Sequence, residues 1–288
     1  MEFTLIKNGN IATVTTAGGE LISFVHNGRE YLWNGDPEFW PGHAPVLFPF
    51  VSALNNSTVS IEGKPCTFND KHGFGRKFDY FCESVGEDEV CFLLKENEVT
   101  LKQYPHRFEL RIIHKMTDRG FSTTYEVKNT DDKNIIFCIG GHPGFAIHGD
   151  IADYTFKFNK EESADLYYTD ENSHFSYDYK WHKSLTGREL NLTYDDFDRD
   201  ALLTVGLNSN AVTVTPADGV GAFEFGFEGY PVLAIWTPPF KKAPFVCLEP
   251  WHGLPALTDE SGNFEDKPFA VTLDPGETKS LTYSFKAL

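Results

Sequence analysis

Residues 3–15 read FTLIKNGNIATVT, two runs of alternating apolar and polar residues on either side of Asn8-Gly9. Alternation with a period of two is the pattern of a β-strand that has one buried face. Asn-Gly readily adopts the positive φ angles that a type I′ turn requires. The stretch therefore predicts a β-hairpin at the start of the chain.

The same alternation continues along the sequence, and a second pair of runs flanks Asn27-Gly28. Helical signals are scarce; Asp195–Leu203 is the best candidate for a short helix or a turn. The stretch Asn159–Asn191 is polar and aromatic, and we interpret it as a hairpin or an excursion that borders a site. Many short strands separated by turn residues indicate an all-β fold, a large antiparallel β-sandwich formed by one domain over residues 1–288. The expected strands are Phe3–Ile6, Ile11–Thr15, Leu21–Val25, Glu30–Trp33, Glu89–Leu94, Phe108–Lys115, Phe121–Lys128, Ile135–Ile139, Tyr154–Phe158, Ala211–Thr215, Phe223–Phe227, Val232–Trp236, Phe245–Leu248 and Lys279–Phe285.

Composition and charge narrow the classes of partner. Of the 288 residues 41% are hydrophobic, enough for a large core, and the formal net charge of -17 repels phosphate backbones and so argues against nucleic-acid binding. No apolar run approaches the roughly 20 residues that span a bilayer. The first ten residues show no signal peptide, so we expect a cytoplasmic protein that does not bind membranes. The sequence leaves a monomer and a homodimer equally open.

The five cysteines are odd in number and contain no CxxC pair. This favours buried free thiols over a disulfide framework or a thiolate zinc site. The ten histidines form no HxH or HExxH pair, so we expect no metal, although scattered His and Glu can converge in a β-barrel. Gly219-Val220-Gly221 lacks the strand–helix context of a phosphate loop and is interpreted as a turn.

Three segments place titratable groups among glycines, prolines and aromatics: KHGFGR at 71–76, GGHPGF at 140–145 and LEPWHG at 248–253. In each, the titratable residue lies at or near the end of an expected strand, where a rigid sheet can present it to a pocket. Two or three His and one Glu, with no activated nucleophile, suit proton transfer.

Each of these residues also has an ordinary structural interpretation. His72 could be a turn residue, His142 a satisfied buried histidine, and Trp251 part of the core rather than a platform for a sugar. Glu249 follows an apolar strand, where an unpaired buried carboxylate is costly, unless it lies exposed at the strand end.

With these segments in place, the chain resembles the aldose 1-epimerase (galactose mutarotase-like) family, and within it the bacterial LacX-like branch. The likeness runs nearly from end to end, and its specificity comes from the order and spread of motifs that are individually weak. The motifs are Gly19–Ser23, Gly28–Trp33, Pro45–Pro49, His72–Phe74, His142–Phe145, Asp200–Leu202, Glu249–Trp251 and Pro275–Glu277.

The resemblance implies a large antiparallel supersandwich with a sugar site on a concave face and no cofactor. It implies that Glu249 is the catalytic base, that His142 is the general acid, and that His72 holds sugar hydroxyls. Trp236 and Trp251 are candidate substrate-binding residues beside them.

The chain departs from the family at two places. An arginine that many members carry after the Leu-Phe-Pro motif corresponds here to Ala53. A sugar-binding aspartate of the galactose mutarotases has no clear counterpart, and Trp236 or a nearby loop residue is a candidate to occupy the same space. Arg76, just after the His-Gly motif, matches an arginine of relatives that bind sugar phosphates.

The implied reaction is the interconversion of the α and β anomers of a hexose. A cyclic hemiacetal opens when its C1 hydroxyl loses a proton and its ring oxygen gains one, so an ionised Glu249 and a protonated His142 would suffice. Two alternatives remain: a hexose-6-phosphate mutarotase, favoured by Arg76 but not by Ala53, and a catalytically silent carbohydrate-binding protein. The expected partner is thus a small sugar, with its phosphorylation left open.

Overall fold

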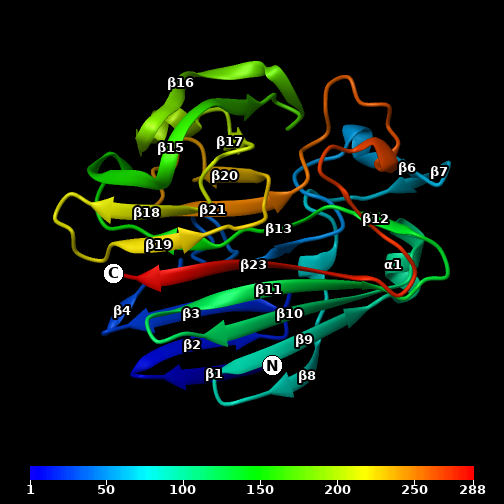
Figure 1. Ribbon diagram of the computed structural model, residues 1–288, viewed down its shortest axis with the longest axis horizontal. Coiled ribbons are helices and arrows are strands. Elements are labelled where there is room, and N and C mark those ends of the chain that lie inside the picture. Colours follow the sequence, from blue (N-terminus) through cyan, green and yellow to red (C-terminus); the bar gives the residue numbers. More distant parts are fainter.

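The computed structural model describes residues 1–288 and shows antiparallel sheets stacked into a supersandwich (Figure 1). A 15-stranded sheet has the order β5-β13-β21-β20-β17-β15-β18-β19-β23-β11-β10-β9-β8, with β14 added on β21 and β16 on β15. A 4-stranded sheet, β1–β4, packs against the β11 and β23 part of the large sheet, where the Phe24 ring lies 5.3 Å from both Phe121 and Phe285. The expected all-β sandwich is confirmed.

The strands of the large sheet are β5 (Val46–Leu47), β8 (Phe81–Val85), β9 (Glu89–Lys95), β10 (Phe108–Met116), β11 (Gly120–Asn129), β13 (Ile139–Gly141), β14 (Gly144–Ala146), β15 (Tyr154–Thr169), β16 (Phe175–Asn191), β17 (Leu202–Val205), β18 (Ala211–Pro216), β19 (Phe223–Gly226), β20 (Val232–Trp236), β21 (Phe245–His252) and β23 (Thr278–Ala287). The small sheet contains β1 (Glu2–Lys7), β2 (Asn10–Thr15), β3 (Glu20–His26) and β4 (Arg29–Glu30). Two-stranded sheets join β6 (Thr58–Ile61) to β7 (Lys64–Thr67) and β12 (Ile135–Phe137) to β22 (Val271–Leu273).

Both expected Asn-Gly hairpins are present. Asn8 and Gly9 have φ angles of 50° and 76°, and Asn27 and Gly28 have 51° and 78°, as a type I′ turn requires. The segment Asn159–Asn191 lies within the long hairpin of β15 and β16, at the top of Figure 1, and Thr169 at the end of β15 reaches the pocket described below. The hairpin interpretation is therefore confirmed.

Helical structure is scarce, as expected, but its position was predicted only in part. The one α-helix, α1 (Glu98–Gln103), was not anticipated; Asn97 caps it by accepting from the amides of Val99 and Thr100. The segment Asp195–Leu203, expected to be a short helix or a turn, begins within a 3₁₀ turn at Tyr194–Phe197 and ends in β17. The other 3₁₀ turns are Asn55–Ser57, Gly75–Lys77, Ile151–Asp153 and Phe264–Asp266.

Buried aromatic rings dominate the core, which is continuous across the layers. Gly219-Val220-Gly221 is a turn, and all five cysteines are free, four of them buried, as expected. No helix has the length and apolarity to cross a membrane.

Candidate active site

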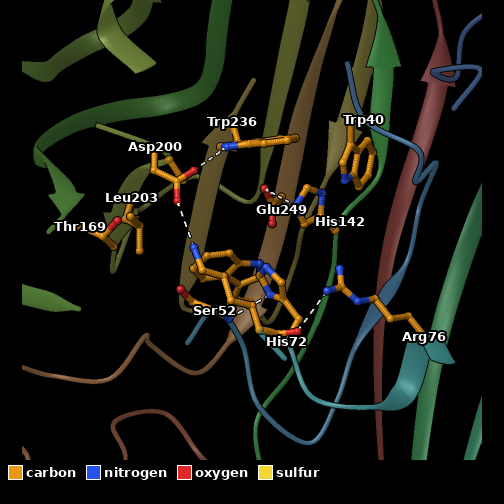
Figure 2. A pocket seen from close by; sticks show the side chains of 13 residues that line it. Trp40, Ser52, His72, Arg76, His142, Thr169, Asp200, Leu203, Trp236 and Glu249 are labelled. Atoms are coloured by element: carbon orange, nitrogen blue, oxygen red, sulfur yellow. Dashed lines mark hydrogen bonds and ion pairs between the residues drawn. The ribbon is translucent and has the colours of Figure 1, made fainter. Parts of the chain in front are cut away.

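One pocket collects titratable residues from all three sequence segments (Figure 2). Its volume is about 220 Å³, and it includes every candidate site residue that the sequence analysis named: Glu249, His142, His72, Arg76, Trp236 and Trp251. The other lining residues are Trp40, Ser52, Lys71, Thr169, Asp200, Ala201 and Leu203.

Strand register brings the His142 and Glu249 side chains together. β13 and β14 pair with β21 so that Gly140 lies opposite Trp251 and Gly144 opposite Cys247. His142 sits in the gap between those pairs and therefore lies opposite Glu249, with Nε2 3.2 Å from Oε1. Two residues more than 100 positions apart become a cross-strand pair through this register.

The alternation of β21 explains which of its side chains reach the pocket. Cys247, Glu249 and Trp251 share one face of the strand because side chains alternate. Glycine at position 140 makes room for this face, since a Cβ there would lie 2.6 Å from the Trp251 ring. Trp251 also belongs to the hydrophobic core and is 3% exposed. It therefore packs in the core and lines the pocket at the same time.

His72 enters the pocket from a constrained loop. Its φ is 67°, and the next residue is Gly73, where a Cβ would lie 2.2 Å from the Phe48 carbonyl oxygen. The Ser52 amide donates to His72 Nδ1 at 2.9 Å. Since Nδ1 accepts, the neutral ring carries its proton on Nε2, which can donate to a ligand.

Two tryptophans enclose the His142 ring. Trp40 stacks on it at 4.7 Å with an interplanar angle of 26°, and Trp236 meets it edge-on at 5.3 Å. Trp40 was not found from the sequence, because it lies in a loop without a recognisable motif. The enclosure removes water from one side of the pair.

Burial determines the electrostatics of the pair. Desolvation raises the pKa of Glu249 well above its usual range, and the Asp200 carboxylate adds to the rise. Desolvation also lowers the pKa of His142 to about 3, with Arg76 contributing, and it lowers the pKa of His72 well below 6.5. Burial therefore favours the uncharged forms of Glu249 and His142 in the empty pocket, whereas the expected reaction needs an ionised Glu249 beside a protonated His142 in the reacting form.

Asp200 and Lys71 are pocket residues that the sequence analysis quoted within motifs but did not assign. Asp200 accepts from Trp236 Nε1 at 2.6 Å and lies 3.7 Å from Lys71 Nζ. Its φ of 75° holds the carboxylate in a backbone conformation that L-residues rarely adopt. The sequence analysis found no counterpart for the family's sugar-binding aspartate and suggested Trp236 or a nearby loop residue for its place. Asp200 contacts Trp236 in the pocket and is a candidate for that role. The motif Asp200-Ala201-Leu202 was the sequence signal that could have identified it.

Arg76 and Ala53, the two positions that bear on the binding of a sugar phosphate, lie in different cavities. Arg76 lines the pocket and donates from Nη2 to the Lys71 carbonyl oxygen at 3.1 Å; desolvation lowers its pKa. Ala53 lines a neighbouring cavity of about 380 Å³ and does not reach the pocket. His252 also points elsewhere, with Nδ1 2.5 Å from the Phe269 carbonyl oxygen.

Three buried groups could in principle hold a metal ion. His142, Cys247 and Glu249 each offer a ligand atom, and these atoms lie within 4.8 Å of one another. A metal would need a thiolate and a carboxylate here. Burial raises the pKa of Cys247 well above its usual range, so its thiol holds a proton that a metal ion would have to displace.

Several polar atoms of the pocket lack a partner in the protein. Glu249 Oε2, His142 Nδ1 and Trp251 Nε1 are buried without a partner at normal hydrogen-bond geometry, although Trp251 lies close enough to Glu249 to oppose the rise of its pKa. Buried polar atoms are normally paired, so these three atoms are available to hydrogen-bond a ligand or water in the pocket.

The fold and this pocket together define a protein of the galactose mutarotase-like supersandwich class. The structure is similar to that of a galactose mutarotase related enzyme from Lactobacillus acidophilus, with a TM-score of 0.93, 28% identity, and coverage of 100% of this chain and 97% of that one. A galactose mutarotase-like protein from Lactobacillus casei gives a TM-score of 0.90 at 27% identity, with both chains fully covered.

The sequence comparisons specify the family. A profile described as aldose 1-epimerase matches residues 1–286. The plasmid-encoded protein LacX of Lactococcus lactis subsp. lactis is 31% identical over 284 residues, 95% of each chain. The chain belongs to the aldose 1-epimerase family, a family of carbohydrate isomerases.

Proposed function

We propose that this protein is a mutarotase that interconverts the α and β anomers of a neutral hexose, with His142 and Glu249 as the acid–base pair. The observation that carries the proposal is the buried contact of His142 Nε2 with Glu249 Oε1 at 3.2 Å, beside the unpartnered Glu249 Oε2. Both groups line a pocket of about 220 Å³.

The pair can complete the reaction with the one proton that moves between Glu249 and His142. In the reacting form Glu249 takes the proton of the C1 hydroxyl while His142 gives a proton to the ring oxygen as the C1–O5 bond breaks. The open aldehyde turns about its C1–C2 bond, and the reverse transfers close the ring on the other face. The net proton count of enzyme and sugar is unchanged.

Substrate binding supplies the reason for the proton to move onto His142. The ionic and the neutral arrangement of the pair contain the same number of protons, so no proton has to enter or leave. Sugar hydroxyls that donate to Glu249 Oε2 favour its charged form in a way that the empty pocket does not. His72 Nε2–H, Arg76 and Asp200 are the groups that would hold the remaining hydroxyls.

The preference for a neutral sugar is supported by the pocket's having only one cation, Arg76, that does not already lie beside a carboxylate of the pocket. Arg76 and Lys71 are its two cations, and Lys71 is already 3.7 Å from Asp200. One arginine can still bind a phosphate bidentately, so a hexose-6-phosphate mutarotase is the second candidate.

Polarimetry of freshly dissolved α-anomers of glucose, galactose and glucose-6-phosphate tests both candidates. We expect acceleration with a neutral hexose and a lower kcat/KM with glucose-6-phosphate, and we expect activity to survive dialysis against EDTA. A higher kcat/KM with glucose-6-phosphate would establish the second candidate. Sugar binding without acceleration of any of the three would show a silent binder.

A further inference from the structure

A second cavity adjoins the acid–base pocket and is larger, about 560 Å³ against 220 Å³. Lys71, Thr169 and Asp200 line both cavities and form the boundary between them. In Figure 2 Thr169 and Asp200 lie on the side of the pocket away from Arg76 and Trp40, so the second cavity opens on that side. A ligand could extend from one cavity into the other.

Thr169 carries an unused hydroxyl at this boundary. The residue is 5% exposed, and its Oγ1 is buried without a hydrogen-bond partner in the protein. A threonine hydroxyl can both donate and accept, and leaving it unpaired costs free energy. A polar ligand that passes between the two cavities would satisfy it.

An exposed aromatic ring stands at the outer rim of the second cavity. Phe240 is 80% exposed and has a φ of 62°, in the left-handed region that a phenylalanine rarely occupies. Lys241 fixes this loop by donating to the carbonyl oxygens of Glu38 and Phe39 at 2.7 and 3.2 Å. The loop joins β20 to β21, the strands of Trp236 and Glu249, so the exposed ring lies beside the candidate active site.

The charges of the second cavity select against anions. Its carboxylates are Asp170, Glu171, Asp198 and Asp200, and its cations are Lys71 and Arg199. Arg199 is held over the Tyr168 ring, 4.6 Å from its centroid. Carboxylates accept hydrogen bonds from hydroxyl groups, and an exposed aromatic ring packs on the apolar face of a sugar ring.

We propose that the second cavity is a subsite for a further sugar ring, and that the preferred substrate is the reducing end of a neutral disaccharide or longer chain. The inference rests on the proposed mutarotase function and extends its substrate class. The reacting ring occupies the pocket of His142 and Glu249. The attached ring lies past Thr169, against Phe240 and the carboxylates.

The test compares sugars that share the same reacting ring. We would measure kcat/KM by polarimetry for glucose and for maltose, cellobiose and isomaltose, which all end in glucose but differ in linkage, and for galactose and β-1,4-galactobiose. The wild-type protein should favour at least one disaccharide over its monosaccharide.

Phe240→Ala should lower kcat/KM for that disaccharide about tenfold, the effect of losing most of one aromatic contact, and leave the monosaccharide unchanged. Phe240→Tyr should restore the preference. Phe81→Ala is the matched control, since Phe81 is 69% exposed on the edge strand β8 and lines none of these cavities.

Calorimetric binding of the same sugars separates this proposal from the proposed function. A protein that accelerates no anomer but binds a disaccharide more tightly than its monosaccharide, through Phe240, would overturn the mutarotase and support the subsite. Equal or weaker kcat/KM and binding for every disaccharide, or equal effects of Phe240→Ala on both classes of sugar, would overturn the subsite.

Discussion

His114 and His142 are both buried histidines with lowered pKa values, yet their surroundings differ. His114, on β10, has both ring nitrogens paired: Nε2 donates to the Gly19 carbonyl oxygen at 2.9 Å, and Nδ1 accepts from Thr123 Oγ1 at 3.0 Å. His142 faces only Glu249 and leaves Nδ1 unpaired. The two histidines therefore differ in hydrogen bonding and not in burial: His114 has a partner for each ring nitrogen, and His142 does not.

The backbone around the two histidines differs in the same way. The pocket includes three residues other than glycine with positive φ, Ser52 at 58°, His72 at 67° and Asp200 at 75°, while β10 and β11 contain none. Such conformations cost of order 1–3 kcal/mol each and persist where the surrounding structure holds them. Positive φ angles at residues other than glycine therefore occur at the pocket and are absent from the two strands around His114.

The largest expected effect is the loss of turnover on removing the pair at the pocket. Glu249→Gln keeps shape but cannot take a proton, so kcat should fall by roughly 10²–10⁴-fold while sugar binding remains. His142→Asn should act similarly, and the double variant should lose less than the product of the two, because the residues act as a unit. Polarimetry on protein with an unchanged circular dichroism spectrum checks this, and near-wild-type turnover in Glu249→Gln would refute the assignment.

The matching change at His114 should affect stability alone. His114→Phe fills the same space but leaves the Gly19 carbonyl and the Thr123 hydroxyl unpaired, so the free energy of unfolding should fall by about 2 kcal/mol. Urea denaturation measures the loss, and kcat below the transition should equal that of the wild type. A drop in kcat comparable to that of His142→Asn would show that the two histidines do not differ as argued.

His72→Asn should change sugar binding more than chemistry. His72 is neutral with its proton on Nε2, which suits it to donate one hydrogen bond to a hydroxyl. Loss of one such bond should raise KM by up to about tenfold with a smaller change in kcat. Initial rates over a range of sugar concentrations separate the two constants, and a fall in kcat with KM unchanged would instead place His72 in the proton transfer.

The smallest expected effect is that of mild acid on the wild type. An exposed histidine would gain a proton near pH 6.5 and give an acid limb there. Burial lowers the pKa of His142 to about 3 and raises that of Glu249, so the pair keeps one proton as the pH falls through 6.5. After subtraction of the spontaneous reaction, kcat/KM should not decline between pH 7 and roughly 5.5. A decline with an apparent pKa near 6.5 would show that the occupied site exposes His142 to water.

Much of this protein could be predicted from its sequence, because its strands are defined by local patterns. Alternation with a period of two and Asn-Gly turns at positions 8–9 and 27–28 depend only on neighbouring residues, and they predicted the hairpins and the all-β class. The sequence analysis missed the helix α1 and several short strands, because elements of two to six residues carry too little of a period to be recognised; these strands are β5, β6, β7, β8, β14, β17 and β22. The three polar segments were visible because glycine and proline interrupt apolar runs there.

The tertiary structure alone decided how those segments meet and what protonation state results. His142 lies opposite Glu249 because β13 and β14 pair with β21 in one register, and nothing near either residue specifies that register. Trp40, Lys71, Thr169 and Asp200 join the pocket from four separate parts of the chain, so no motif contains them together. The reversed order of the two pKa values follows from the loss of water around the pair, and desolvation is a property of the packed fold, not of any stretch of sequence.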